Sequence, residues 1–265
     1  MAKGLIAIDL DGTALDSQQK ISDRTKRALR DARASGYEVV IATGRPPRSS
    51  ITYHRELGLD GPIVTFNGAF VHHENKPDFH YHVPLDRLKT LELLEECRRF
   101  RVHNIMMEIK DKFYVWKRDE ITDFLSYGDT PAAIGSIEEQ LSDHPTVLLV
   151  RTPLEYVHPF MQQVGQRFGK DVELRYWGDY FQVIEVKRSG ISKVTGLSHI
   201  AQIMGITREQ VIAFGDSAND LEMIEWAGLG VAMGNAPDEL KKRADDVTET
   251  NEQDGVAAFL EKLIL

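Results

Sequence analysis

Residues 5–13 read LIAIDLDGT, an apolar run that ends in two carboxylates one residue apart. The apolar part is typical of a strand buried on both faces, as in a parallel sheet covered by helices. Burying Asp9 and Asp11 without a partner would cost more free energy than the strand contributes. We therefore expect these two residues at an open sheet edge, where they hold a cation.

Mg²⁺ fits such a dense set of oxygen ligands, and it commonly brings a substrate phosphate with it. If the strand continues through Asp11, the side chains of Asp9 and Asp11 point the same way, and Gly12 then turns the backbone. A plain turn at the end of a strand is the competing interpretation, so the rest of the chain has to decide.

The whole chain has 265 residues, enough for one large core or two smaller ones, and no apolar run near the ~20 residues of a membrane span. Its 41 acidic and 32 basic residues give a net charge of −9, which argues against a nucleic-acid partner. A small phosphorylated metabolite remains compatible with this charge if local positive groups meet it.

The N-terminus leads straight into a strand and only one cysteine is present, so we expect a cytoplasmic protein. No feature predicts a membrane contact or an obligate protein partner.

Apolar runs alternate with helical patterns at both ends of the chain. This alternation predicts an α/β fold with a doubly wound, parallel, Rossmann-like core sheet and right-handed crossovers. We assign this core to residues 1–82 and 187–265. The expected core strands are 5–8, 39–42, 62–66, 211–214 and 229–233.

From about residue 83 the pattern changes to helices and paired strands. A helix is expected over residues 86–100, with Leu88, Leu91, Leu94 and Cys97 on one face, and Cys97 is expected to be structural. We expect residues 83–186 to form an inserted α+β domain whose antiparallel sheet has helices on one side. Its expected strands are 104–109, 112–116, 146–151, 172–177 and 181–186, with a helix over 156–168.

The segment 71–82 carries four histidines around an Asn-Lys-Pro-Asp turn, which predicts a hairpin. His80 and His82 would share one strand face, so zinc is an alternative. No cysteine accompanies them, and a solvated hairpin explains them without metal. We adopt the solvated hairpin for the four residues, which are His72, His73, His80 and His82.

Polar residues also follow other core strands, namely Thr43 after the second strand and Asp216 and Asp220 after the fourth. Because the carboxyl ends of parallel strands meet at one edge of a sheet, we expect these side chains beside Asp9. Lys193 lies at the start of a helix. That end of a helix is already positive, so a cation is unfavourable there unless an anion lies nearby. Together these residue types suit Mg²⁺ and a phosphoryl group.

In these segments the sequence resembles the haloacid dehalogenase superfamily, and within it the Cof-type phosphatases with a large C2-type (C2B) cap between the second and third motifs. The resemblance runs from end to end, and no motif position departs from it. The matching segments are Asp9-Leu-Asp11-Gly-Thr, Thr43-Gly-Arg, Lys193, Gly215-Asp216-Ser-Ala-Asn219-Asp220, Val231-Ala-Met-Gly-Asn-Ala236 and Asp254-Gly-Val-Ala257.

The resemblance implies roles for residues in the first four of these segments. Asp9 would be the nucleophile and Asp11 the general acid and base. Mg²⁺ would be held by the side chains of Asp9 and Asp216 and by the backbone carbonyl of Asp11. Asp220 would orient Lys193 or a metal-bound water. The phosphoryl oxygens would be bound by Thr43, Lys193, Asn219 and the backbone N–H groups of Leu10 and Gly44.

The expected activity is that of a Mg²⁺-dependent phosphatase acting on small phosphorylated metabolites, such as sugar phosphates or nucleotide-like cofactors, through an aspartyl phosphate. The insert would close over the site as a lid. A phosphosugar mutase, similar to phosphomannomutase, is the alternative with the same core and cap. A sensor without catalysis would have no need of Asp11. A dehalogenase has no leaving alkoxide to protonate, and the dehalogenases of this superfamily lack that acid.

Overall fold

In the computed structural model, which describes residues 2–264, the N-terminal apolar run is strand β1, Gly4–Ile8, at the centre of a sheet. The strand order is β14-β13-β12-β1-β2, and all four neighbouring pairs are parallel. The bridge between Ala42 and Val64 adds β3 alongside β2. The prediction of a parallel core sheet is therefore confirmed. The remaining bounds are Tyr37–Ile41 for β2, Ile63–Thr65 for β3, Val211–Gly215 for β12, Leu229–Ala232 for β13 and Asp246–Val247 for β14.

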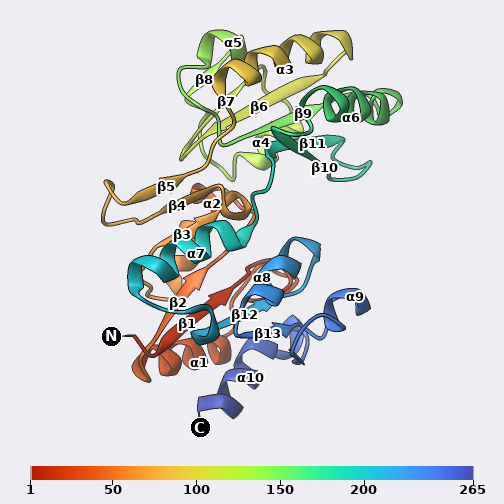
Figure 1. Ribbon diagram of the computed structural model, residues 1–265. Helices are drawn as coiled ribbons and strands as arrows, with labels where there is room; N and C mark the ends of the chain where they lie inside the picture. Colours follow the sequence, from red (N-terminus) through yellow and green to blue (C-terminus); the bar gives the residue numbers. More distant parts are fainter. Residues whose placement is uncertain (1, 265) are drawn as a thin grey trace. The chain divides into compact units, whose positions relative to one another are not determined.

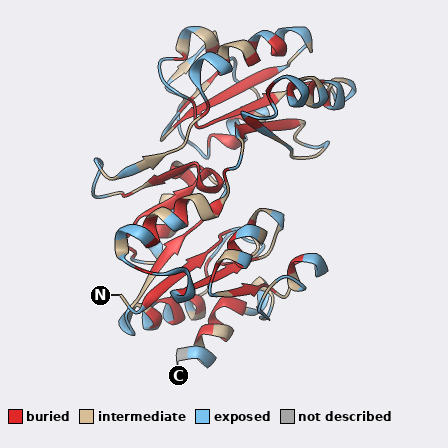
Figure 2. Ribbon diagram, in the orientation of Figure 1, coloured by how far each residue is buried: buried red, intermediate tan, exposed pale blue. Residues whose placement is uncertain are grey.

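Helices cover both faces of this sheet, as Figures 1 and 2 show. Successive side chains of β1 point to opposite faces, so each face needs its own covering layer and the strand contributes to two cores. Ile6 and Ile8 pack with helices α1 and α10, whereas Leu5 and Ala7 pack with α7 and α8. Each fully buried aliphatic side chain contributes about 1.5–3 kcal/mol. The helices are α1 (Asp23–Ala34), α2 (Pro47–Glu56), α7 (Lys193–Met204), α8 (Leu221–Trp226), α9 (Asp238–Lys241) and α10 (Gly255–Ile264). Single 3₁₀ turns lie at Phe66–Gly68, Arg208–Gln210, Ala218–Asp220 and Asn251–Gln253.

The contacts of the chain divide it into two compact units. Unit 1 contains the chain up to Pro46, Ser50–Tyr81 and the chain from Ser192 onward. Unit 2 contains Pro47–Ser49 and His82–Ile191. No helix within residues 2–264 combines the length and hydropathy needed to cross a membrane.

The histidine segment forms strands β4, Phe70–His72, and β5, His80–His82, in a small sheet of order β3-β4-β5. His73 is buried rather than solvated, and its Nδ1 accepts a hydrogen bond from Asn75 N at 3.2 Å. Within residues 2–264, the one group of carboxylate, imidazole or thiol ligands with metal-site spacing contains no histidine. The hairpin prediction holds, while the expectation of uniform solvation was wrong for His73.

Unit 2 is built on a sheet of order β10-β11-β9-β6-β7-β8, which is antiparallel except for the pair β7 and β8. Helices α3 and α6 pack on one face of this sheet, where Ile105, Leu148 and Ile184 join them in one core. The expected α+β architecture is confirmed. The helices are α3 (Arg87–Arg99), α4 (Glu120–Leu125), α5 (Ile137–Gln140) and α6 (Leu154–Phe168). The strands are β6 (Asn104–Ile109), β7 (Lys112–Val115), β8 (Ala133–Ile134), β9 (Val147–Arg151), β10 (Val172–Tyr176) and β11 (Val183–Arg188).

The predicted buried face of α3 was partly wrong. Leu88 is 65% exposed, whereas Leu94 and Cys97 are buried. Residues turn about 100° each around a helix, so a spacing of three drifts, and Leu88 and Cys97 lie on opposite sides. The observed core face uses mixed spacings of three and four, through Thr90, Leu93, Leu94 and Cys97.

Helix α2 ends with a buried imidazole, His54, whose Nε2 lies 3.0 Å from Gly61 O. Burial lowers the pKa of His54 below its usual value. Between that lowered pKa and about 6.5, the unfolded chain binds a proton that the folded chain does not, so stability should fall as the pH drops through this window. We expect His54→Gln, which keeps a donor but does not titrate, to lose less free energy of unfolding between pH 7 and pH 5. Urea unfolding measures this difference, and equal losses would contradict it.

Candidate active site

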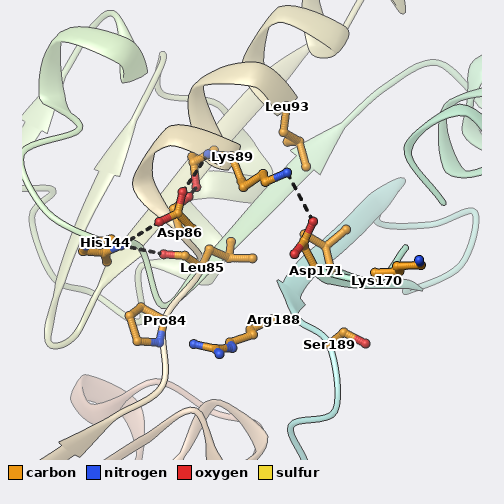
Figure 3. A pocket seen from close by; sticks show the side chains of 12 residues that line it. Pro84, Leu85, Asp86, Lys89, Leu93, His144, Lys170, Asp171, Arg188 and Ser189 are labelled. Atoms are coloured by element: carbon orange, nitrogen blue, oxygen red, sulfur yellow. Dashed lines mark hydrogen bonds and ion pairs between the residues drawn. The ribbon is translucent and has the colours of Figure 1, made fainter. Parts of the chain in front are cut away.

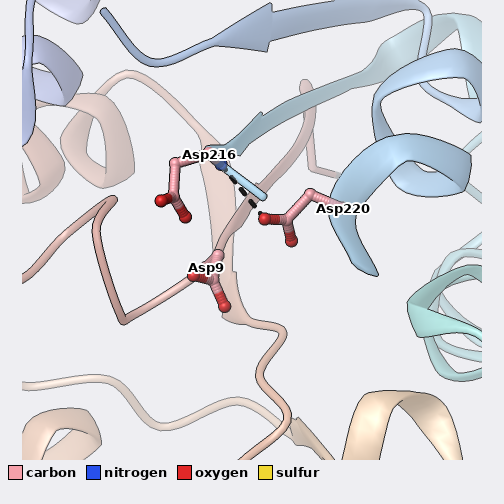
Figure 4. A group of neighbouring side chains, drawn as sticks. All are labelled: Asp9, Asp216 and Asp220. Carbon is pink, nitrogen blue, oxygen red and sulfur yellow. Dashed lines mark hydrogen bonds between the residues drawn. The ribbon is translucent and has the colours of Figure 1, made fainter. Parts of the chain in front are cut away.

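Four charged side chains of unit 1, from three segments that are distant in sequence, meet at the carboxyl end of β1. Asp9 directly follows β1 and is only 4% exposed. The Nζ atom of Lys193, fully buried, lies 2.5 Å from Asp9 Oδ1 and 2.6 Å from Asp220 Oδ1. Oxygen atoms of Asp9, Asp216 and Asp220 all lie within 4.8 Å of one another, and Figure 4 shows the three carboxylates converging.

Lys193 is held at this edge by the start of helix α7. Ser192 and Thr195 form a reciprocal capping box there, with Thr195 Oγ1 accepting from Ser192 N at 3.3 Å. Gly68 lets the backbone approach, since a Cβ at this position would lie 1.9 Å from Ser192 O. Burial alone would lower the pKa of Lys193, but the carboxylates of Asp220 and Asp9 outweigh it and raise the pKa. The two carboxylates therefore stabilise a cation that both burial and the helix dipole disfavour.

The Asp220 carboxylate uses both of its oxygens inside the protein. Its Oδ1 binds Lys193, and its Oδ2 accepts hydrogen bonds from the backbone N–H groups of Asp216 and Ser217, each at 3.0 Å. Asp216 is more open: Thr13 and Asn235 approach its oxygens at 3.4 Å each. Asp220 is thus placed to orient Lys193, while Asp9 and Asp216 retain oxygens for another ligand.

Three carboxylates face a single ammonium at this edge, which leaves an excess of negative charge. Burial raises the pKa of Asp9, with Lys193 opposing and Asp220 adding to the increase. Burial and the charge of Asp220 likewise raise the pKa of Asp216 to about 6. A further cation would relieve this repulsion, and donors that are all oxygen suit Mg²⁺. The residues present therefore fit a divalent metal.

Asp11 lies outside this group. Strand β1 ends at Ile8, and a turn follows in which Thr13 N and Leu15 N both donate to Leu10 O. The strand alternation therefore does not extend across Asp9 and Asp11. The Asp11 carboxylate is half exposed and receives two hydrogen bonds from Arg45, at 2.7 and 2.5 Å.

The expected phosphate-binding residues lie in neighbouring loops of unit 1. Thr43 is fully buried, and its Oγ1 accepts from Arg45 N at 3.2 Å. Asn219 donates through Nδ2 to Asn67 Oδ1 at 2.9 Å, and a Cβ at Gly44 would lie 3.1 Å from that same oxygen. Asn67 thus joins the Gly44 and Asn219 loops, and its backbone is left-handed, with φ 53°.

The family motifs assigned no role to Asn67, Arg45 or Asn235, although Arg45 and Asn235 lie in segments that carry the resemblance. Asn67 carried a usable signal, because it follows strand β3 as Thr43 follows β2, with Gly68 behind it. Asn235 lies in the matching segment 231–236, but the resemblance implied no role for it. Its side chain reaches Gly12 O at 2.8 Å from a loop that is distant in sequence.

Unit 2 contains a separate cavity of about 490 Å³, shown in Figure 3. It contains none of the predicted site residues. Lys89 lies 3.5 Å from Asp171, and Asp86 accepts hydrogen bonds from the first backbone N–H groups of α3. Among the described residues, the carboxylate group with metal-site spacing lies at Asp9 and not in this cavity, so the cavity does not compete with the carboxylate site.

Comparison with known proteins agrees with the chemistry that this site geometry suggests. A family model described as haloacid dehalogenase-like hydrolase matches residues 6–260. The chain is 40% identical over 262 residues to the 5-amino-6-(5-phospho-D-ribitylamino)uracil phosphatase YitU of Bacillus subtilis, covering 97% of this chain and 96% of that protein. It is 30% identical to the pyridoxal phosphate phosphatase YbhA of Escherichia coli, covering 98% of each.

A solved haloacid dehalogenase-like hydrolase from Bacteroides thetaiotaomicron superposes with a TM-score of 0.86 at 28% identity, covering 98% of this chain and 99% of that one. Fold, sequence and the carboxylate edge agree over nearly the full length. The chain therefore belongs to the haloacid dehalogenase-like hydrolases and is a phosphatase of that family.

Proposed function

We propose that this phosphatase is Mg²⁺-dependent and hydrolyses phosphomonoesters of small metabolites through an aspartyl phosphate on Asp9. The observation that supports this most is the contact of Asp9 with Lys193 beside Asp216, at the carboxyl end of β1. A nucleophilic carboxylate needs positive charge nearby, because the phosphoryl group it attacks is itself an anion.

The remaining site residues take the following roles in this proposal. Asp11, oriented by Arg45, protonates the leaving oxygen and then takes a proton from the hydrolytic water. Asp220 keeps Lys193 in position through the 2.6 Å contact. The groups that bind phosphoryl oxygens are the side chains of Thr43, Lys193 and Asn219 and the backbone N–H groups of Leu10 and Gly44.

Asp9 and Asp216, with the backbone carbonyl of Asp11, would hold the metal. When bound, Mg²⁺ would shield the nucleophile from the negative charge of the substrate. Thr13 and Asn235 each contact an oxygen of Asp216 at 3.4 Å and would help to hold its carboxylate in this site.

The chemistry would reside in residues 1–82 and 187–265, and the insert 83–186 would act as the cap that selects the organic part of the substrate. The relatives YitU and YbhA are named for substrates that join a phosphate to a planar nitrogenous ring. We therefore propose 5-amino-6-(5-phospho-D-ribitylamino)uracil as the first substrate to test.

Phosphate release from a panel of metabolites, with and without Mg²⁺, tests the proposal. We expect release from several monoesters, with loss of activity after chelation and recovery on adding Mg²⁺. A protein that releases no phosphate from any monoester would contradict it. Net isomerisation of a hexose 1-phosphate without phosphate release would favour a mutase instead.

Gly12 offers a direct test of the proposed metal site. Its φ is +75°, and a Cβ there would lie 2.3 Å from Asp216 Oδ2. We expect Gly12→Ala to displace Asp216 and raise the Mg²⁺ concentration for half-maximal activity by about tenfold or more, in the range found for altered metal surroundings. Gly58→Ala is the matched control, because Gly58 also has a positive φ, +62°, but lies beside Arg33. An unchanged Mg²⁺ requirement in Gly12→Ala would contradict the assignment.

A further inference from the structure

Four aromatic side chains gather at one end of the unit 2 sheet. Trp177, Tyr180 and Phe181 lie on the connection between β10 and β11, and Phe124 lies on α4, elements that Figure 1 labels. The ring centroid of Phe181 lies 5.7 Å from Phe124, 6.4 Å from Trp177 and 5.0 Å from Tyr180. Despite this clustering, Phe124 is 60% exposed and Tyr180 is 85% exposed. Stacking surface is therefore open to a ligand.

A buried carboxylate lies beside these rings. Glu185 is in β11 between Ile184 and Val186, which both face the core of α3 and α6, so its side chain points to the opposite face of the sheet. It is 5% exposed, and its Oε2 accepts a hydrogen bond from Trp177 Nε1 at 3.0 Å.

Within residues 2–264, no cation forms an ion pair with Glu185, and the Trp177 bond is the one hydrogen bond to its carboxylate. Arg175 is its cross-strand neighbour on β10 but does not come within ion-pair distance. Lys187, the next residue on the same face, is engaged by Glu173 and Ile191 O instead. Glu185 thus retains an oxygen that can accept a hydrogen bond.

The second oxygen of this carboxylate, Oε1, makes no hydrogen bond within the protein and is not sealed from solvent, so it is open to a ligand. A carboxylate removed from water needs several donors or a cation, and a single indole N–H meets only part of that need. A planar ring with N–H groups would supply the missing donors while its faces stack on the aromatic side chains. An open-chain sugar alcohol such as ribitol offers hydroxyl donors but no planar ring that could stack on the aromatic side chains.

We propose that Glu185, with Trp177 and Phe181, recognises the planar nitrogenous ring of the substrate by accepting its N–H groups while the aromatic side chains stack on it. This inference deepens the proposed phosphatase function and rests on it for the identity of the reaction. It assigns substrate choice to one carboxylate and its aromatic neighbours within unit 2.

The test compares two phosphate esters that share the ribityl 5-phosphate part, namely 5-amino-6-(5-phospho-D-ribitylamino)uracil and D-ribitol 5-phosphate, which carries a hydroxyl in place of the amino-linked ring. We expect Glu185→Gln to raise KM for the ring-bearing ester about tenfold or more, as loss of a charge-assisted hydrogen bond predicts, with kcat changed by less than about threefold. For D-ribitol 5-phosphate, kcat/KM should stay within about twofold of the wild-type value, which also shows that the variant folds. Phe181→Ala should act in the same direction.

Glu173→Gln is the matched control, because Glu173 is an exposed carboxylate on the adjacent strand that pairs with Lys187 at 3.3 Å. It should leave both esters unaffected. Equal losses on both esters in Glu185→Gln, or no loss on either, would overturn the inference.

A second measurement separates this inference from the proposed function. Phosphate-free 5-amino-6-(D-ribitylamino)uracil should quench tryptophan fluorescence in the wild type and much less in Trp177→Phe, which keeps Trp116 and Trp226. If the wild type hydrolyses neither ester, the proposed function fails while this titration still tests the ring site. Quenching that is the same in both proteins would overturn the ring site alone.

Discussion

Lys193→Met should both stop phosphate release and destabilise the fold. The change removes the ammonium from between Asp9 and Asp220 and leaves two buried carboxylates facing each other. Breaking a buried ion pair by removing one partner costs about 3–5 kcal/mol. If Lys193 contacts the phosphoryl group as proposed, loss of its preorganised charge costs a further factor of about 10²–10³ in kcat. Urea unfolding and phosphate release measure the two effects separately.

The stability loss in Lys193→Met should depend on pH in a stated direction. Burial already raises the pKa of Asp9, and Lys193 opposes this increase, so removal of the ammonium raises the pKa of Asp9 further above the unfolded value. The folded variant then binds a proton more readily than the unfolded chain, so it is most stable at low pH and loses stability as the pH rises through this raised pKa. The deficit relative to wild type should therefore be larger at pH 8 than at pH 5.

Two further variants serve as controls for Lys193→Met. Lys89→Met removes a lysine from the half-exposed pair with Asp171 and should change stability by less than about 1 kcal/mol. Adding Asp220→Asn to Lys193→Met should restore part of the lost stability without restoring activity. A Lys193→Met protein as stable as wild type at pH 8 would show that the two carboxylates do not depend on this lysine.

The parallel core was predictable because its strands are short apolar runs that end in polar residues. Because those ends share one edge of a parallel sheet, the topology alone predicts that Asp9, Lys193 and Asp216 lie close together. The order of helical patterns and paired strands between residues 83 and 186 likewise predicted the α+β insert. Such patterns survive in a single sequence because burial imposes them on every strand and helix.

Other features depend on tertiary contacts that the hydrophobic periodicity of the sequence does not reveal. The turn after β1 directs Asp11 to Arg45 instead of to Asp9, and two backbone hydrogen bonds to Leu10 O produce this turn. Asn67 reaches Asn219 across 152 positions, and the left-handed backbone that permits it is visible only in three dimensions. The buried face of α3 was missed for a simpler reason, since a spacing of three residues was treated as a helical repeat.

The ring site in unit 2 was also beyond sequence reasoning. Glu185 lies inside an apolar strand, where the pattern VIEVKR gives no indication of a ligand. Glu185 points to a ligand because, among the described residues, no cation pairs with its carboxylate and only one donor contacts it. The aromatic residues near it occupy a loop and a short helix that are over fifty positions apart.

Asp9→Asn should lower phosphate release by a factor on the order of 10⁴ or more, because it removes the proposed nucleophile. The fold should survive, because Lys193 keeps its contact with Asp220 and one of the mutually repelling carboxylates becomes neutral. At pH 7.5 the free energy of unfolding should therefore stay near the wild-type value or exceed it. Activity and stability thus change independently here, in contrast to Lys193→Met.

Asp11→Asn provides the matched comparison, because it removes the proposed acid and base while Asp9 stays intact. With an aryl phosphate, whose leaving group needs no proton, Asp11→Asn should still transfer the phosphoryl group to Asp9 but release it slowly. Intact-protein mass spectrometry after acid quenching should then show one added phosphoryl group in Asp11→Asn and none in Asp9→Asn or in the double variant. A phosphorylated Asp9→Asn protein would place the nucleophile elsewhere. Unchanged turnover in Asp11→Asn would remove Asp11 from the mechanism, because its pairing with Arg45 would then serve structure alone.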